Sequence, residues 1–262
     1  DENVLFKRMN ARVLKLFPEL RFENNSYYDK MYFTLKKIDF WAVISESYYK
    51  EIFENPCVDL KTRINQTKSK SGFVNLGVGE IKTKLYQPFD VGNFRELRQK
   101  NKTYLLKEFS AQRVKTKFVD ISLLKSEDCE IRGYLDSFYE SPLIFVKFDN
   151  DIFKSGVDIA LNSILKLFEL RKNIQVIVNI PNGLSNNFIK SWVEFLENNF
   201  DFNGRWLFID GKINIEQFYA ASDINLLPRR INSSDVEYLS GMKLGCIPVA
   251  SRVGILNDTV AD

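Results

Sequence analysis

The sequence contains no histidine and only three cysteines among its 262 residues. Without imidazole, the chain lacks the commonest general base at neutral pH, histidine metal ligands, and Ser/His or Cys/His nucleophile pairs. Cys57, Cys129 and Cys246 are far apart and lack CxxC spacing, so neither a disulfide framework nor a zinc site is indicated. Any chemistry must therefore use carboxylates, Lys, Arg or the backbone, and we expect no cofactor and no metal.

Excess charge and long apolar runs are equally scarce. The 37 Lys plus Arg and 34 Asp plus Glu leave a formal net charge of +3, and both signs are interspersed along the chain. Nothing in the composition therefore indicates nucleic acid as a partner. No apolar run approaches the roughly 18 residues of a membrane span, and the N-terminal segment carries charges where a signal peptide would be apolar. With few cysteines, the chain is predicted to be a soluble cytoplasmic protein.

From Pro142 onward, short apolar segments alternate with amphipathic segments. The predicted strands are 143–146, 174–180, 206–209, 224–227 and 247–250, and the predicted helices are 157–170, 187–198, 215–221 and 236–244. Strands that are apolar on both faces and alternate with helices form a doubly wound parallel sheet. We therefore predict an α/β fold with a Rossmann-like second domain at residues 141–262. Ligands of such sheets bind beyond the carboxyl ends of the strands, which places a site near the loops after Val146, Leu227 and Ala250.

The first 140 residues are less regular. The apolar runs 38–45 and 72–79 predict buried strands. The stretch Ser45-Glu46-Ser47 supplies an N-cap candidate for a helix ending before Pro56, and 93–109 predict a helix with an interruption near Asn101. We expect a remnant of a first Rossmann-like domain at 1–80 and a linker with interdomain helices at 81–140. The two strands are too hydrophobic for sheet edges, so we expect a protein partner or a further segment to cover this incomplete domain. The abrupt ends suggest a piece of a longer protein.

Two stretches near the end carry a family resemblance. Residues 218–230 read FYAASDINLLPRR, and residues 236–260 read VEYLSGMKLGCIPVASRVGILNDTV. In order and almost without gaps, they resemble a run found in glycogen and starch synthases, and a sparser likeness covers the chain from residue 38. The resemblance implies the two-domain GT-B fold and the retaining transfer of glucose from a nucleotide sugar to the end of an α-1,4-glucan.

The donor-binding motifs of that family are altered in this sequence. In the family, an Arg and a Lys at the turn after the first strand of the second domain bind the donor diphosphate, because negative charge grows there in the transition state. The resemblance implies that five donor-site positions are degenerate, because other residues replace those of the family there: Asn150, Ser155, Asn232, Asp235 and Ile255. It leaves as donor-binding candidates Lys147, Lys154, Arg230, Glu237 and Gly254. No residue is assigned as catalytic.

Each altered position also has an ordinary structural explanation. Asp235 is a good N-cap for the helix at 236–244, Asp149 and Asp151 belong to a polar turn, and Asp258 is expected to cap a closing helix. Two interpretations of function stay open, beside that of an unrelated doubly wound domain. The first is a synthase-like protein that has lost nucleotide-sugar chemistry and is a structural or binding component of a larger assembly. The second is an active glucosyltransferase that uses ADP-glucose or UDP-glucose.

Overall fold

The computed structural model describes residues 39–54, 65–74, 92–116, 119, 121–125, 129–138, 140–149, 151–232 and 236–260. The chain divides into two compact units, Asp1–Asn75 and Leu76–Asp262. The domain limits expected at residues 80 and 140 stay a prediction.

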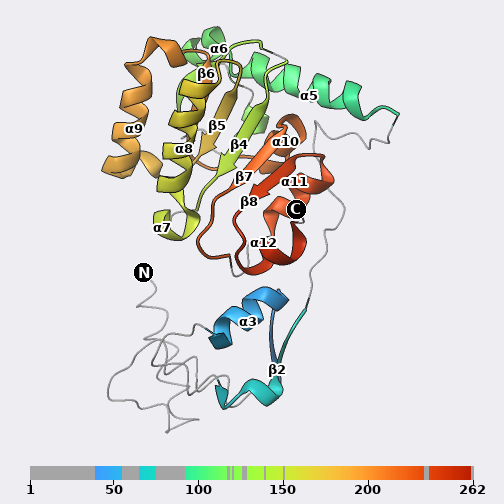
Figure 1. Cartoon of the computed structure of the whole chain (residues 1–262). Helices are drawn as coiled ribbons and strands as arrows, with labels where there is room; N and C mark the ends of the chain where they lie inside the picture. Colours follow the sequence, from blue (N-terminus) through green and yellow to red (C-terminus); the bar gives the residue numbers. More distant parts are fainter. Residues whose placement is uncertain are drawn as a thin grey trace, which may run out of the picture. The chain divides into compact units, whose positions relative to one another are not determined.

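The second unit is built on a six-stranded sheet with the order β3-β6-β5-β4-β7-β8 (Figure 1). Its strands are β3 (Glu130–Leu135), β4 (Leu143–Lys147), β5 (Gln175–Asn179), β6 (Arg205–Asp210), β7 (Ile224–Leu227) and β8 (Ile247–Ala250). Strands β4 to β8 run parallel to one another, and β3 pairs antiparallel with β6 at the edge. The parallel sheet predicted from the alternating pattern is confirmed. Strand β3 was not predicted.

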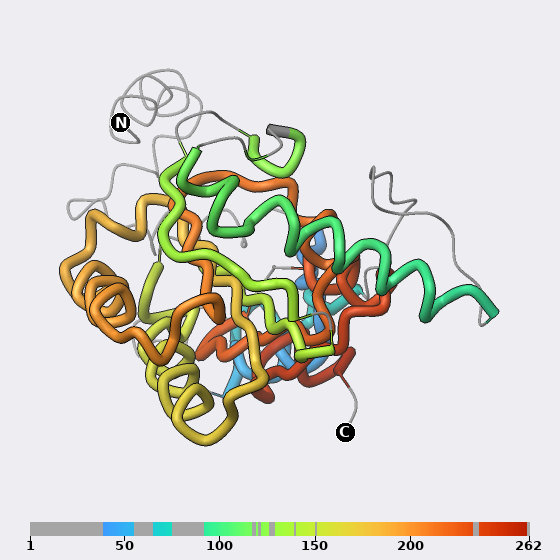
Figure 2. The backbone as a smooth tube through the Cα atoms, turned by 90° about the horizontal axis from the view of Figure 1, so that it is seen from above, coloured from blue at the N-terminus to red at the C-terminus, as the bar shows by residue number. Residues whose placement is uncertain are grey.

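Helices cover both faces of this sheet, as the view in Figure 2 shows for α5 and α8 on opposite sides. The helices are α5 (Phe94–Glu108), α6 (Ala111–Thr116), α7 (Ile152–Ser155), α8 (Val157–Leu170), α9 (Asn187–Glu197), α10 (Ile215–Ala221), α11 (Glu237–Lys243) and α12 (Gly254–Thr259). Successive residues of a strand point to opposite faces. Thus Phe145 packs in the core formed with α5 and α10, whereas Val146 packs in the core formed with α8 and α9.

Helix α5 is fixed to the sheet by a buried charge cluster. The side chain of Lys102 is almost fully buried, and its Nζ donates to Asp223 Oδ2 at 2.7 Å and to the Ser141 carbonyl at 2.5 Å. Asp223 Oδ2 also accepts from the backbone N–H of Leu143 at 2.8 Å, and Arg98 lies 3.5 Å from Asp223 Oδ1. Because Asp223 immediately precedes β7, these contacts tie α5 to the amino ends of β4 and β7.

The first unit contains a small parallel ribbon, β1 (Trp41–Val43) with β2 (Ser71–Phe73), and helix α3 (Glu46–Glu54). Ser45 Oγ accepts the N–H of Tyr48 at 3.0 Å, so within the predicted stretch Ser45-Glu46-Ser47 the capping residue is Ser45. On the surface of this unit, the exposed large hydrophobic side chains among the described residues are those of Phe40, Phe73 and Val74. Residues 1–38 and 75–80, within which parts of the predicted strands fall, lie outside the described residues.

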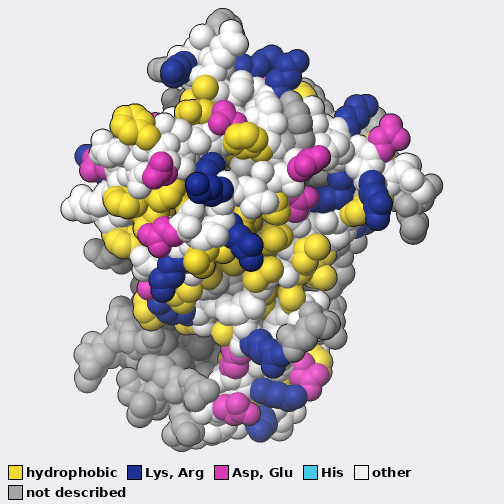
Figure 3. Space-filling model, turned by 45° about the horizontal axis from the view of Figure 1, so that its top comes forward, with side chains coloured by type: hydrophobic (Ala, Val, Ile, Leu, Met, Phe, Trp, Pro, Cys, Tyr) yellow, Lys and Arg dark blue, Asp and Glu magenta, His cyan; other side chains and the backbone are white. Residues whose placement is uncertain are grey.

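The surface of the described residues offers no large area of one charge on the face drawn in Figure 3, where Lys and Arg lie among Asp and Glu. None of the described helices has both the length and the apolar character needed to cross a membrane.

Candidate functional site

Two loops at the carboxyl edge of the sheet meet at Gly156. The backbone N–H of Arg230, in the loop after β7, donates to the carbonyl of Lys154, in the loop after β4, at 2.9 Å. Gly156 has φ of 69°, and a Cβ atom there would lie only 1.8 Å from the Pro228 carbonyl oxygen. Glycine is therefore required at this position, because a side chain would separate the two loops. The geometry fixes the positions of Lys154 and Arg230 relative to each other.

Arg230 is fully engaged in joining these loops. Its two terminal nitrogens donate to the carboxylate of Asp158 at 2.7 and 2.8 Å, one of them also reaches the Phe153 carbonyl at 3.0 Å, and the guanidinium lies 4.6 Å from the centre of the Phe153 ring. Hydrogen bonds from Arg230 lower the pKa of Asp158, and the same pair raises the pKa of Arg230. Arg230 thus connects β7 to the start of α8.

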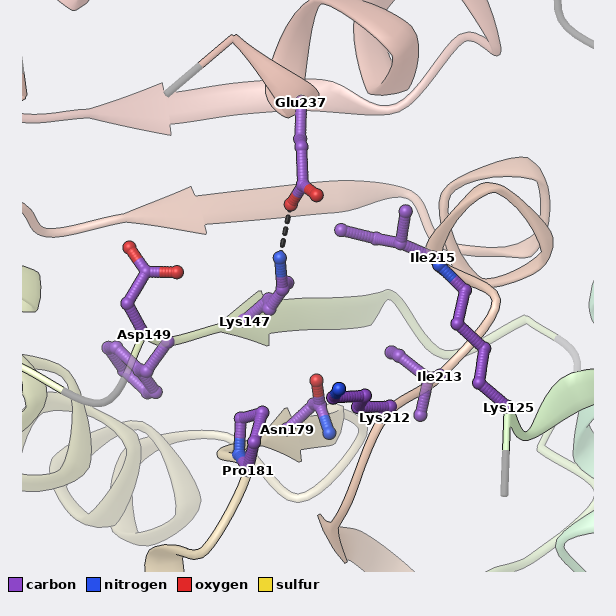
Figure 4. Close-up of a pocket in the computed structure, with 10 residues that line it drawn as sticks. Lys125, Lys147, Asp149, Asn179, Pro181, Lys212, Ile213, Ile215 and Glu237 are labelled. Carbon is purple, nitrogen blue, oxygen red and sulfur yellow. Dashed lines mark hydrogen bonds and ion pairs between the residues drawn. The ribbon is translucent and has the colours of Figure 1, made fainter. Parts of the chain in front are cut away.

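Three further cations near this edge, Lys147, Lys154 and Arg229, are also paired with carboxylates. Lys147, the last residue of β4, forms an ion pair with Glu237, the first residue of α11 (Figure 4). Arg229 Nη1 lies 2.9 Å from Asp149 Oδ2. Lys154 Nζ lies 3.2 Å from Asp151, which also caps α7 by accepting the N–H of Lys154. That backbone hydrogen bond lowers the pKa of Asp151. We call Lys147, Lys154, Arg229 and Arg230 the paired cations.

A cavity of about 340 Å³ opens beside the Lys147–Glu237 pair, within the second unit. Its lining comes from the segments at the carboxyl ends of β4, β5 and β6, from the first residues of α10 and α11, and from the segment before β3. The lining residues are Lys125, Lys147, Phe148, Asp149, Asn179, Pro181, Lys212, Ile213, Ile215 and Glu237. Figure 4 shows Asp149 and Lys125 on opposite sides of the view, with Lys147, Asn179 and Lys212 between them. Of the three loops expected to form a site, those after Val146, Leu227 and Ala250, the first contributes Lys147, Phe148 and Asp149 to this lining and the other two contribute no residue to it. The expected location of a ligand site stays a prediction.

Three of the positions that the resemblance marks as degenerate are described by the structure, and all three are interior. Ser155, Asn232 and Ile255 are each about 98% buried. Ser155 Oγ accepts the N–H of Asp149 at 3.3 Å, so it supports the turn. Asn150 and Asp235 lie outside the described residues, and the proposed cap by Asp235 stays a prediction.

Gly254 and Asp258 have structural surroundings that the sequence did not indicate. Gly254 has φ of 48°, and a Cβ atom there would lie 2.0 Å from the Asn232 carbonyl oxygen. The prediction that Asp258 caps a helix start is wrong, because α12 already begins at Gly254 and Asp258 lies near its end. The left-handed conformation of Gly254 lets the helix begin immediately after Val253.

The sequence indicated Lys147 and Glu237 as candidates for a site, and the structure brings them together. It did not indicate Lys125 and Lys212, which line the same cavity. These two lysines belong to no motif, and they become neighbours through an isolated antiparallel bridge between Leu124 and Ile213, with the N–H of Lys125 donating to the Lys212 carbonyl. The two segments are far apart in the sequence, so no local signal could have indicated this pairing.

Comparison with known proteins identifies the fold of this chain. No protein-family model matches the sequence, and no curated protein sequence matches it. Among solved structures, the catalytic domain of starch synthase IV from Arabidopsis thaliana, bound to ADP and acarbose, superimposes on 88% of this chain with a TM-score of 0.64 and 18% identity. The chain has a GT-B glycosyltransferase-like fold.

Further GT-B glycosyltransferases match with lower similarity. WaaG, a glycosyltransferase involved in lipopolysaccharide biosynthesis, matches 86% of this chain and 59% of its own at 14% identity and a TM-score of 0.46. A UDP-forming trehalose-phosphate synthase from Burkholderia xenovorans matches 88% of this chain and 50% of its own at 8% identity and a TM-score of 0.47. The GT-B-like chain spans 43% of the starch synthase chain.

Proposed function

We propose that this chain is a starch- or glycogen-synthase-like GT-B protein that does not transfer sugar and acts as a structural or binding component of a larger assembly. The observation that supports this proposal is the pairing of all four of the paired cations with carboxylates of the same unit. In a glycosyltransferase, cations at this edge of the sheet would face the leaving diphosphate.

The pairing makes binding of a nucleotide diphosphate costly. A diphosphate would have to displace Glu237 from Lys147, or approach Asp149 and Asp151 beside Arg229 and Lys154. Hydrogen bonds to charged groups contribute roughly 1.5 to 3 kcal/mol each. Losing two of them removes about two to four decades of affinity, at about 1.4 kcal/mol for each decade. We therefore expect dissociation constants no tighter than about 1 mM for ADP-glucose and UDP-glucose.

The first unit supports the proposal of a protein partner. Phe40 is 60% exposed and Val74 is 54% exposed, and both flank the short β1–β2 ribbon. A two-stranded ribbon is marginal alone, and exposed apolar side chains beside it gain stability when another surface covers them. The partner that we propose covers this ribbon and completes the unit.

The test is calorimetric titration of ADP-glucose and UDP-glucose into the full-length protein, together with an assay for glucose incorporation into an α-1,4-glucan. We expect no saturation below about 1 mM and no incorporation. Micromolar binding of either nucleotide sugar would overturn the proposal, as would glucan extension by the purified protein.

The second candidate function is the active glucosyltransferase. The observation that favours it is the cavity of about 340 Å³ at the carboxyl edge of the sheet, the location at which doubly wound sheets bind ligands. This function requires Lys147 to leave Glu237 and contact the donor. Glucose incorporation that is lost in Lys147→Met would establish it in place of the first proposal.

A further inference from the structure

Helix α9, which lies beside α8 at one flank of the second unit (Figure 1), carries aromatic side chains on a side that faces solvent. Phe188 is 46% exposed, Phe195 is 51% exposed, and Phe200, in the turn after the helix, is 83% exposed. Residues seven apart lie on the same side of a helix, two turns from each other. We call Phe188 and Phe195 the aromatic row. Large apolar side chains gathered on one exposed side are typical of an interaction surface.

The aromatic row is distinct from the side of α9 that packs in the core. The core-facing residues of the helix are Ile189, Trp192, Val193 and Leu196. The exposed phenylalanines therefore add a second apolar side to a helix that has already buried one. A surface helix of a globular protein usually has polar residues opposite its core-facing side, so the row calls for an explanation other than the packing of this unit.

Two opposite charges of α9 lie beside the aromatic row. The side chains of Lys190 and Glu194 are 59% and 55% exposed, and their charged atoms are 4.0 Å apart, too far for a strong ion pair. At about 100° for each residue, the exposed Ser191 lies between the row and these charges around the helix. Glu197 is engaged elsewhere, since it lies 3.2 Å from Arg132 of β3. The exposed side of α9 thus combines an apolar row, a small residue and one charge of each sign.

This exposed side is complementary to itself. Phe188 and Phe195, and likewise Lys190 and Glu194, are spaced evenly about the same point near Ser191. If two copies of α9 pack antiparallel about a two-fold axis at this point, Phe188 meets the partner's Phe195, and Lys190 meets the partner's Glu194. The symmetry forms each contact twice, and the small Ser191 at the centre lets the two helices approach closely. A parallel pair would place Lys190 against the partner's Lys190, so the charges favour the antiparallel arrangement.

The same charges disfavour a membrane surface as the occupant. A helix that lies on a membrane carries mainly Lys and Arg on its polar side. The charged residues of α9 are one lysine and two glutamates, Lys190, Glu194 and Glu197. Acidic side chains are repelled by anionic lipid headgroups. A second copy of this chain, in contrast, supplies both the apolar row and the matching charges.

We propose that this chain forms a reversible two-fold dimer through antiparallel contact of α9 with α9 of a second copy. A helix of 11 residues is about 16 Å long, so the contact is smaller than the roughly 800 Å² for each partner that stable complexes bury. We therefore expect a weak dimer, with a dissociation constant of about 10 to 100 µM. The contact uses no residue of the carboxyl edge or of the β1–β2 ribbon, so the inference does not rest on the proposed function.

The experiment is sedimentation equilibrium of the full-length protein between about 5 and 500 µM, where a dimer of this strength goes from mostly dissociated to mostly formed. Phe195→Ser should weaken dimerisation by at least about tenfold, because it removes two apolar contacts across the axis. The control is Phe138→Ser, which removes a phenylalanine of similar exposure, 52%, from the loop between β3 and β4 and should leave dimerisation unchanged. A monomer over the whole range, or equal effects of the two substitutions, would overturn the inference.

Charge exchange tests the antiparallel arrangement. Lys190→Glu and Glu194→Lys each turn two attractive contacts across the axis into repulsive ones, and each should weaken dimerisation by about tenfold. The double variant Lys190→Glu with Glu194→Lys restores both contacts with the signs reversed and should dimerise like the unmodified protein. Single variants with unchanged dimerisation, or a double variant as weak as the single ones, would show that another surface joins the copies.

Discussion

At the residue scale, single side chains and glycines hold the carboxyl edge together. Gly156 and Gly254 adopt left-handed conformations against the carbonyls of Pro228 and Asn232. The resemblance to glycogen and starch synthases marked Gly254 as a donor-binding candidate, and its close contact with Asn232 explains the glycine without any ligand. A motif can therefore persist for packing after its polar neighbours have changed.

Replacing Gly156 by Ala tests this packing role. The added Cβ would lie 1.8 Å from the Pro228 carbonyl oxygen. We expect Gly156→Ala to lower the free energy of unfolding by about 2 to 3 kcal/mol, since a strained backbone position typically costs 1 to 3 kcal/mol and a clash is added here. Urea denaturation measures the loss. Gly183→Ala is a comparison at a buried glycine without positive φ, where the added Cβ would lie 2.9 Å from Ile180 Cβ, so it should cost less but not nothing. An equal or smaller loss for Gly156→Ala would contradict the argument.

The pair of Arg230 with Asp158 predicts a pH-dependent stability. Because Arg230 lowers the pKa of Asp158 in the folded protein, the pair stabilises above the unfolded pKa and loses that contribution as pH falls through the folded pKa. Both side chains are partly exposed, so Asp158→Asn should cost only about 0.5 to 1 kcal/mol at pH 7. The difference between variant and unmodified protein should be constant well above the ordinary aspartate pKa of about 3.9 and should shrink as the pH falls below it. A difference that is independent of pH in chemical denaturation would refute the electrostatic origin.

At the element scale, the regular half of the chain could be predicted more completely than the irregular half, where the predicted helix 93–109 is confirmed as α5 but β3 was missed. The strands and helices from β4 to β8, apart from the short helix α7, follow from apolar periodicity, which a doubly wound sheet imposes on its elements. Strand β3 was missed because it lies at an edge and mixes Glu130, Arg132 and Gly133 with apolar residues. Helix α5 continues through Asn101, where an interruption was expected, because the Asn101 side chain donates to the Ala220 carbonyl at 3.3 Å.

The contacts of Lys102 predict that this single side chain stabilises the packing of the whole helix α5 against the sheet. Lys102→Met leaves Asp223 with Arg98 and the Leu143 N–H but removes a buried ammonium that bonds two acceptors. We expect a loss of about 2 kcal/mol of stability, below the 3 to 5 kcal/mol of a fully buried pair, because Asp223 is partly exposed. Hydrogen exchange of α5 should accelerate. Lys100→Met, on an exposed position of the same helix, should change neither quantity, and equal effects of the two substitutions would disprove the anchoring role.

At the scale of the whole molecule, the sequence predicted the parallel sheet whose carboxyl edge carries the candidate residues, but not the ion pairs that these residues form. The degenerate positions could be named by resemblance, whereas the partners of the paired cations could not. Glu237 lies 90 residues from Lys147, and Asp149 lies 80 residues from Arg229. Such pairs depend on which loops lie next to each other at the carboxyl edge. The apolar periodicity of the sequence does not indicate which loops are neighbours.

The central claim is that carboxylates of this chain occupy the cations that a donor diphosphate would need. The most direct measurement is the affinity of ADP-glucose for the unmodified protein, for Glu237→Gln, and for Glu169→Gln, which removes an equal charge from an exposed position of α8. We predict no binding tighter than about 1 mM for the unmodified protein and Glu169→Gln, and about tenfold tighter binding for Glu237→Gln, because Lys147 is then released. Micromolar binding by the unmodified protein, or identical affinities of the two variants, would contradict the claim.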